Sequence, residues 1–166
     1  NIFNNSRINL NQVDYVEIRQ DENQYQVKYG DIFFTTSSET AEEVGMASVL
    51  LDEVKELYLN SFCFGFRLNS FSVLLPEYAR YCLRGNLIRD EIYKLAQGAT
   101  RYNLSKTQLM KLYIPIPAIK EQHKIACVLN ATDQEIDLLQ KQLEAMKQQK
   151  KGLMQKLLTG KIRITN

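Results

Sequence analysis

The chain has 166 residues, of which 45% are hydrophobic and 24% are charged, and its formal net charge is +2. This composition is typical of a folded soluble protein and excludes a disordered chain. No apolar run approaches membrane-spanning length, and residues 1–5 do not resemble a signal peptide. We therefore expect a cytoplasmic protein that has no membrane segment.

The charges are unevenly distributed along the chain. Residues 1–66 carry four basic and eleven acidic side chains, whereas residues 67–119 carry eight basic and three acidic ones. Residues 120–166 carry nine basic and five acidic side chains. A basic excess confined to part of a chain is typical of proteins that bind polyanions, although a solvated charged surface gives the same pattern.

The first part of the chain, over residues 13–68, is predicted to be mainly β-strand. Its apolar and β-branched runs alternate with short turns. Phe62, Phe64 and Phe66 alternate with other residues and predict one buried aromatic face, with a platform for stacking bases as the alternative. The hydroxyl-rich segment from Thr35 through Thr36 and Ser37 to Ser38 breaks this pattern. It predicts a loop that could bond to phosphates or base edges, with a plain surface turn as the alternative. The predicted strands cover 13–18, 25–29, 32–34, 47–51 and 62–66.

Two short helices are predicted next, the first beginning at Pro76 and the second ending before Gly98. Arg80 and Arg84 are four residues apart, which predicts that they share one helix face and could contact phosphates. The loop that follows, residues 98–104, combines a flexible backbone with donors suited to bases. Arginine can bond to guanine, asparagine to adenine, and tyrosine can stack or hold a phosphate. Its candidate residues are Thr100, Arg101, Tyr102 and Asn103, and Lys106 follows in a predicted single helical turn.

The last quarter of the chain is predicted to be one long helix over residues 119–158. Apolar residues recur there with spacings of three and four for more than four heptads, which is typical of a coiled coil. A helix of 40 residues is about 60 Å long, so it needs a second helix to cover its apolar seam. The alternative is a long helix packed on its own domain. The predicted seam contains Ile125, Leu129, Thr132, Ile136, Leu139, Leu143, Met146, Lys150, Leu153 and Leu157.

No catalytic constellation is recognisable. The glycines are too far apart for a nucleotide or S-adenosylmethionine loop, and the single His123 has no metal-site neighbours. Cys63, Cys82 and Cys127 are widely spaced and are predicted to stay reduced. Only Glu53 and Lys55, with Asp31 as a third member, match part of a metal-dependent nuclease site. A solvated turn explains this match better, so we expect neither a metal nor a cofactor.

Several blocks of the sequence together resemble the specificity subunit of type I restriction–modification systems. The stronger matches are residues 98–105, 114–117, 121–125 and 150–163, and the weaker ones are 30–32 and 58–60. The resemblance implies an α+β fold, in which a small mixed α/β target recognition domain is followed by a long coiled-coil helix. It implies a target recognition domain at 1–117, the helix at 118–160 and a short strand at 161–166.

The resemblance also implies the function. Such a chain does no chemistry but reads one half of a split double-stranded DNA site in a bacterium or archaeon. It positions methyltransferase subunits, which use S-adenosylmethionine, and a restriction and motor subunit. One recognition unit implies a half subunit that forms a homodimer, or a fragment of a two-unit chain. A coiled-coil adaptor that binds only protein, and the nuclease, are the alternatives.

Overall fold

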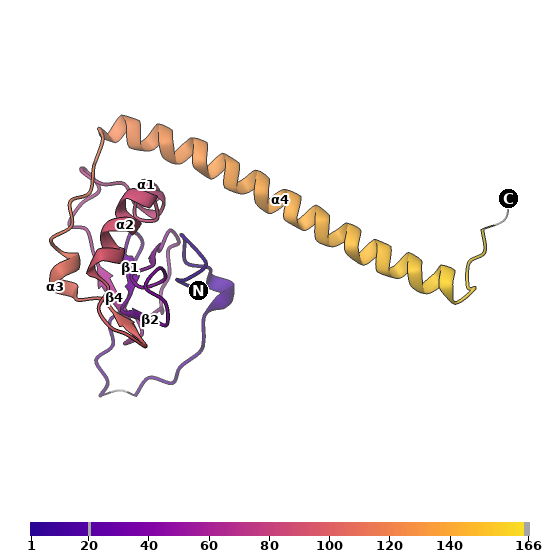
Figure 1. The fold of residues 1–166 in the computed structure, drawn as a ribbon, viewed down its shortest axis with the longest axis horizontal. Helices are drawn as coiled ribbons and strands as arrows, with labels where there is room; N and C mark the ends of the chain where they lie inside the picture. The colour runs from indigo at the N-terminus through magenta and orange to yellow at the C-terminus, as the bar shows by residue number, and fades with distance from the viewer. Residues whose placement is uncertain (20, 165–166) are drawn as a thin grey trace. The chain divides into compact units, whose positions relative to one another are not determined.

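A computed structural model describes residues 1–19 and 21–164 and shows the expected α+β fold (Figure 1). The chain divides into two compact units, Asn1–Ala126 and Cys127–Asn166. The strands and short helices lie in the first unit, and most of one long helix lies in the second. In chain order the elements are the 3-10 helix η1 (Leu10–Gln12), β1 (Ile32–Thr35), β2 (Ser37–Ser38), β3 (Ala47–Val49), β4 (Cys63–Phe66), α1 (Pro76–Cys82), α2 (Asn86–Leu95), β5 (Tyr102–Asn103), α3 (Lys106–Leu109) and α4 (Ile119–Leu158).

A three-stranded antiparallel sheet with the order β3-β1-β4 is the centre of the first unit. Phe33 of β1 lies opposite Ser48 of β3 and Gly65 of β4. All four residues of β1 are buried, as the apolar run 32–34 predicted for the first three, whereas Thr35 was predicted to lie in the following loop. Because side chains alternate along a strand, Ile32 and Phe34 join the main core on one face and Phe33 points to the other.

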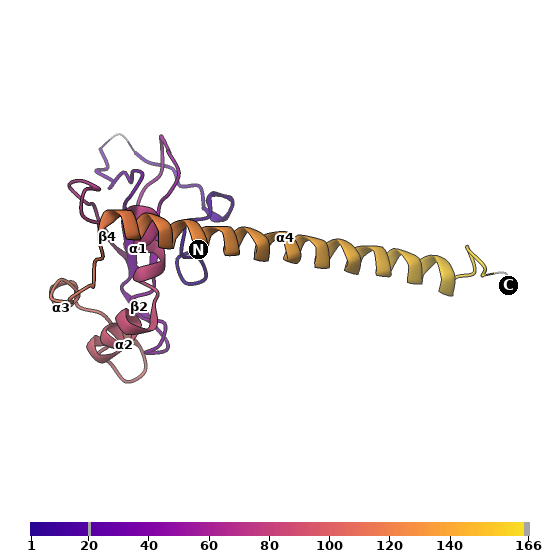
Figure 2. The same ribbon diagram turned by 90° about the horizontal axis from the view of Figure 1, so that it is seen from above.

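Helices α1 and α2 supply the rest of the main core, and Figure 2 shows them together with the strands in a second view. Pro76 begins α1 at its first position, where its missing N–H costs no hydrogen bond. Ala79, Ile88 and Ile92 are almost fully buried in the cluster. Both helices lie where the sequence predicted them, because apolar residues recur there at helical spacing.

The N-terminal segment covers the second face of the sheet with a smaller cluster that includes Ile8, Val27 and Leu50. Ile8 N–H donates to the Val49 carbonyl at 3.0 Å, which fixes this segment beside β3. The predicted strand at 13–18 was wrong, because residues 13–19 form no strand. Their β-branched and aromatic side chains find no sheet to pack on, so Tyr15 is fully exposed. The strand predicted at 25–29 is reduced to an isolated bridge between Gln26 and Tyr58.

Helix α4 begins and ends at the residues that its periodicity predicted. Its first turns belong to the first unit, where Gln122 is completely buried. The Gln122 side-chain N–H group donates to the carbonyls of Val73 and Pro117 at 2.8 Å each, and its oxygen accepts from Leu75 N–H at 2.9 Å. Ile125, the first residue of the predicted seam, is half-buried and packs against the domain core. One glutamine side chain therefore ties the start of α4 to the domain.

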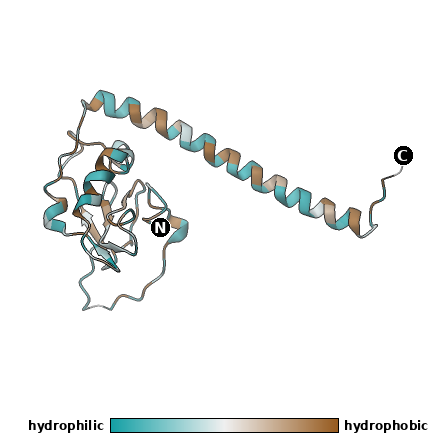
Figure 3. Cartoon of the chain, in the orientation of Figure 1, coloured by the Kyte–Doolittle hydropathy of each residue, from teal (hydrophilic) through white to brown (hydrophobic). Residues whose placement is uncertain are grey.

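The rest of α4, in the second unit, is exposed along its length. From Cys127 to Ile164, Asp133 and Gly152 alone among the described residues are half-buried, and the others are exposed. Figure 3 shows hydrophobic residues recurring along this helix among hydrophilic ones. The strand expected at 161–166 is not formed by residues 161–164, because 161–162 make a bend and 163–164 have no regular structure, and residues 165–166 lie outside the described part. No helix in the described ranges is long and apolar enough to cross a membrane.

Candidate nucleic-acid interface

The two polar segments that the sequence singled out lie side by side. Residues Ser37–Ser38 form β2 and pair antiparallel with Tyr102–Asn103, which form β5. Ser37 is opposite Asn103, and Ser38 is opposite Tyr102. Leu104 N–H extends the pairing by donating to the Thr36 carbonyl at 2.9 Å. The segment 35–38 is thus not the predicted loop, because Thr35 belongs to β1 and Ser37–Ser38 pair with a strand more than 60 residues away in the sequence.

This two-stranded ribbon, β2 with β5, has an inward and an outward face. Ser38 is buried and donates to the Glu43 carboxylate at 3.0 Å, and Tyr102 packs against the main core. On the other face, Asn103 is exposed and Ser37 is half-buried. The alternation of side chains across a strand explains this division. The ribbon therefore presents Ser37 and Asn103 outward and uses Ser38 and Tyr102 to hold itself on the domain.

Arg101 extends over the outward face of the ribbon. Its Nε and terminal nitrogen donate to the Ser37 hydroxyl at 3.2 and 3.1 Å, and the residue is exposed. The turn before it requires Gly98, which has φ of +140°, and a Cβ there would lie 2.0 Å from the Arg101 carbonyl oxygen. Thr100 is also exposed in this turn. The turn therefore fixes the backbone that carries Arg101 while its side chain remains accessible.

Two neighbouring elements complete the surroundings of the ribbon. The predicted helical turn after β5 is α3, although its N-cap Ser105 makes no side-chain cap bond. Lys106 is exposed there, with its ammonium 5.4 Å from the centre of the Phe66 ring. Exposed Glu39 and Glu42 follow β2 in the chain, so the ribbon is flanked in the sequence by acidic as well as basic residues.

Several predicted contact residues are used inside the domain. Thr35 is buried, and its hydroxyl accepts from Met46 N–H at 3.0 Å. Arg80 is buried, with its guanidinium 4.2 Å from the centre of the Tyr81 ring. Arg84 lies beyond the end of α1, so the predicted shared helix face was wrong. Its guanidinium donates to the carbonyls of Ile2 and Phe3, and burial lowers its pKa.

Arg89, a further arginine of the basic stretch, also bonds within the domain. Arg89 donates to the carbonyls of Gly45 at 2.7 Å, Val44 at 2.9 Å and Glu42 at 2.5 Å. Burial, followed by the charge of Arg84, lowers the Arg89 pKa. These side chains hold loops together, so the basic excess of residues 67–119 overstates the positive charge that the domain presents outward.

The sequence placed Phe62 in the core, but the structure exposes 67% of it. Phe62 N–H donates to the Asn60 side-chain oxygen at 3.1 Å in a turn before β4, whereas Phe64 and Phe66 pack against the core as predicted. The pair Asn60-Ser61 is a turn signal that separates Phe62 from the strand pattern. The Phe62 carbonyl accepts from Thr36 N–H, immediately before β2, which places the turn beside the ribbon.

Comparison with known proteins identifies the family of this chain. The family model described as type I restriction modification DNA specificity domain matches residues 2–148. The chain belongs to this family. A putative type I restriction enzyme MjaX specificity subunit from Methanocaldococcus jannaschii is 30% identical over 161 residues, which are 95% of this chain and 37% of that protein. The type I restriction enzyme MjaVIII specificity subunit of the same organism is 32% identical over 90 residues, 54% of this chain and 21% of that protein.

The fold of the specificity domain is also similar to a solved one. The crystal structure of a type I restriction–modification system S subunit from M. genitalium matches 80% of this chain and 33% of that chain, with a TM-score of 0.61 and 19% identity. The present chain therefore spans about a third of the length of the first of these relatives and of this solved structure. The match confirms the combination of a small α/β domain with a long C-terminal helix.

The specificity domain uses Asp31 for structure. The buried Asp31 carboxylate accepts from Arg67 at 2.8 and 2.6 Å and from Lys28 N–H at 2.8 Å. The hydrogen bond to Asp31, together with the Asp31 charge, raises the pKa of Arg67. Arg67 balances the charge of Asp31 in this ion pair, so the carboxylate has a structural role in the domain, whereas Glu53 and Lys55 are exposed. No group of three or more His, Cys, Asp or Glu within residues 1–19 and 21–164 could hold a metal.

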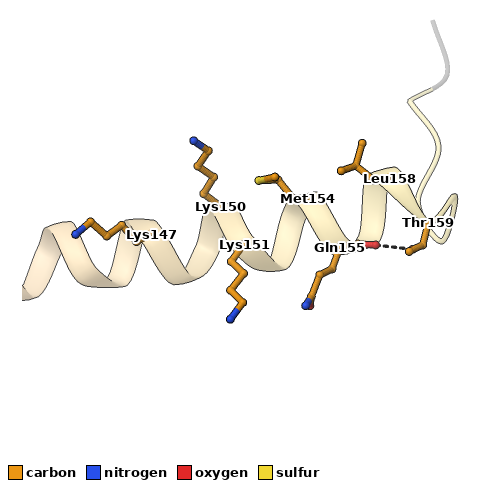
Figure 4. A pocket seen from close by; sticks show the side chains of 7 residues that line it. All are labelled: Lys147, Lys150, Lys151, Met154, Gln155, Leu158 and Thr159. Carbon is orange, nitrogen blue, oxygen red and sulfur yellow. Dashed lines mark hydrogen bonds between the residues drawn. The ribbon is translucent and has the colours of Figure 1, made fainter.

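The second unit of the specificity domain presents the predicted seam. Leu139, Leu143 and Met146 are 57%, 54% and 66% exposed. Near the end of α4 a hollow is lined by both basic and apolar side chains (Figure 4). In Figure 4, Lys150, Met154 and Leu158 project from one side of the helix, and Lys151 projects from the other. Lys150 occupies a seam position, where a charge lowers stability and can fix the register of a coiled coil.

Proposed function

We propose that this chain is a non-catalytic DNA-recognition component of a type I restriction–modification complex, and that it reads one half of a bipartite target. The observation that carries the proposal is the outward face of the β2–β5 ribbon, with Arg101 over Ser37 and Asn103 beside them. Membership of the DNA specificity domain family supports it. We assign the recognition role to residues 1–117 and assembly to the helix that follows.

The chemistry of the ribbon suits the major groove of DNA. A two-stranded β-ribbon fits this groove, and its base pairs present patterns that distinguish all four arrangements. The fork of Arg101 matches the two acceptors of guanine, and the amide of Asn103 matches the donor and acceptor of adenine. Thr100 and Lys106 are exposed nearby and are assigned to phosphates. The proposed interface does not include four of the predicted residues, because they are buried or bonded within the domain: Thr35, Ser38, Arg80 and Arg84.

Substitution of Arg101 tests this proposal in the assembled complex. We expect Arg101→Ala to weaken specific binding by about 1–3 kcal/mol and to relax the preference at one base pair. Lys106→Ala should weaken binding to all sequences alike and flatten the dependence on salt. Lys94→Ala is the matched control, because Lys94 is exposed but paired with Glu91. If the Arg101 variant binds like the wild type at every DNA sequence and salt concentration, the ribbon is not part of the DNA interface.

We infer that the exposed seam of α4 packs against another long helix, either that of a second copy or that of a second unit in a longer chain. We further infer that the assembly carries methyltransferase and restriction subunits and acts in the cytoplasm of a bacterium or archaeon. The relatives' names as specificity subunits support these partners. A coiled-coil adaptor that binds only protein is the second candidate, favoured by the exposed seam. It would show no salt-dependent DNA binding.

The non-catalytic role has its own test. The purified chain should neither cleave nor methylate unmethylated plasmid in the presence of magnesium, ATP and S-adenosylmethionine. Methyl transfer should occur only after methyltransferase subunits are added. Cleavage by the chain alone that is lost in Glu53→Ala would instead support the nuclease alternative.

A further inference from the structure

Phe62 is an exposed aromatic residue beside the ribbon, and the proposed contacts give it no role. It is 67% exposed, whereas the neighbouring Phe64 and Phe66 pack against the core. Leaving a phenylalanine ring in water forgoes about 1.5–3 kcal/mol of hydrophobic stabilisation. The ring is therefore available for an apolar contact with a partner.

The backbone of Phe62 is held in place on both sides. Its N–H donates to the Asn60 side-chain oxygen at 3.1 Å. Its carbonyl accepts from both the N–H and the hydroxyl of Thr36, each at 3.0 Å. Because both backbone polar groups are bonded, the ring is presented from an ordered turn. A side chain presented in this way loses less conformational entropy on binding than one on a mobile loop.

The same hydrogen bonds connect Phe62 to the ribbon. Thr36 precedes Ser37, whose backbone pairs with Asn103 and whose hydroxyl accepts from Arg101. Phe62, Ser37 and Arg101 therefore belong to adjacent, directly bonded segments of the first unit. A ligand that engages Arg101 and Asn103 therefore lies against a segment that is bonded directly to the turn carrying Phe62.

We propose that Phe62 is a specificity-determining residue whose ring packs against the 5-methyl group of a thymine in the major groove. This inference rests on the proposed function, namely DNA reading by the ribbon. The thymine methyl is the apolar group in the groove pattern, whereas the other distinguishing groups are hydrogen-bond donors and acceptors. Arg101, Asn103 and Phe62 then supply the three contacts suited to guanine, adenine and thymine.

The test removes the methyl group from DNA and the ring from the protein. The chain is assembled with its methyltransferase subunits, and its affinity is measured for target duplexes in which each thymine in turn is replaced by deoxyuridine. We expect one replacement to weaken wild-type binding about fourfold, the equivalent of one buried methyl group. Phe62→Ala should bind the thymine and deoxyuridine duplexes equally, and Phe62→Leu should keep part of the difference.

The control is Tyr93→Ala, which removes a half-exposed ring from α2 and should retain the full fourfold ratio. Each ratio compares two duplexes with one protein preparation, so a partly unfolded variant does not distort it. Absence of any deoxyuridine effect in the wild type, or an effect that persists in Phe62→Ala, would overturn the thymine contact. The proposed function would still stand if Arg101→Ala loses specificity in the same assay. Absence of sequence-specific binding by the wild-type complex would overturn both.

Discussion

Val49 and Ile92 in the first unit are completely buried, whereas Leu139 and Leu143 in the second unit are more than half exposed. The first unit closes its core with its own strands and helices. The second unit is a helix that forms according to its sequence periodicity but leaves its apolar seam without a cover. Because a single helix gains little stability without packing, this difference supports our proposal that the first unit folds by itself and that the second serves assembly.

Breaking the seam should have the largest effect. We expect Leu139→Asp combined with Leu143→Asp to raise the dissociation constant of the assembly at least about a hundredfold, because two buried leucines contribute roughly 3–6 kcal/mol per helix. Analytical ultracentrifugation would then show monomers at concentrations where the unmodified chain associates.

Lys141→Asp is the matched control for the seam. It also adds a negative charge to α4, but it lies outside the heptad positions of the seam. A control that dissociates as fully as the seam variant would mean that charge, not apolar packing, governs association. A wild-type chain that is monomeric at micromolar concentration would contradict self-association through α4.

Opening a cavity in the first unit should have the next largest effect. Ile92→Ala is expected to lower the free energy of unfolding by about 2–5 kcal/mol, because the methyl groups it removes are fully buried. Leu139→Ala makes a similar truncation at an exposed site and should leave the unfolding of the domain unchanged in the unassembled chain. Urea denaturation measures the free energy of unfolding of both variants. An equal loss of stability in the two would contradict the difference between a buried core in the first unit and an exposed helix in the second.

The Gln122 side chain provides a smaller and more local test. Gln122→Leu keeps the volume but leaves Leu75 N–H and two carbonyls without their partner, which should cost about 1–3 kcal/mol. Hydrogen exchange should show faster exchange of the Leu75 amide. Gln134→Leu, on the exposed part of the same helix, should change neither quantity. Undiminished protection of Leu75 would show that the buried amide is not what holds the start of α4.

The smallest expected effect is on alkaline stability. Burial, assisted by the hydrogen bond to Glu77, raises the pKa of Tyr29 from 10.0 to about 12. Folding therefore favours the protonated phenol, and this contribution is complete below pH 10 and is lost as the pH rises towards 12. Tyr29→Phe should make the melting temperature less dependent on pH in that window. Tyr78, whose pKa is also raised to about 12, remains as a second contributor. An unchanged slope would contradict the assignment to Tyr29.

The sequence predicted what depends on local periodicity. The spacing of apolar residues located α1, α2 and the full extent of α4, and the run Ile32-Phe33-Phe34 located the buried strand β1. The prediction of a strand at residues 13–18 failed, because residues with high β-propensity form a strand only where another strand lies beside them. The prediction of a loop also failed at Ser37–Ser38, because the pairing with Tyr102–Asn103 depends on contacts between residues far apart in the chain.

The candidate site divides in the same way. Residue types suited to DNA were visible in the sequence, and the structure brings Arg101, Asn103 and Ser37 together. The sequence did not predict that Arg84 and Arg89 bond to backbone carbonyls. An arginine that binds loop carbonyls cannot be distinguished by sequence from one that is free at the surface. The exposure of Phe62 was hidden by its place in an alternating aromatic pattern.

Comparison of methylated DNA from cells with and without this chain tests the central claim most directly. If the chain reads half of a bipartite target, one split sequence motif should carry methylated bases in the wild type and lose them when the chain is deleted. Complementation with Arg101→Ala should restore methylation at a motif with relaxed preference at one position, and the Lys94→Ala control should restore the original motif. A methylation pattern that is identical with and without the chain would contradict its role in DNA recognition.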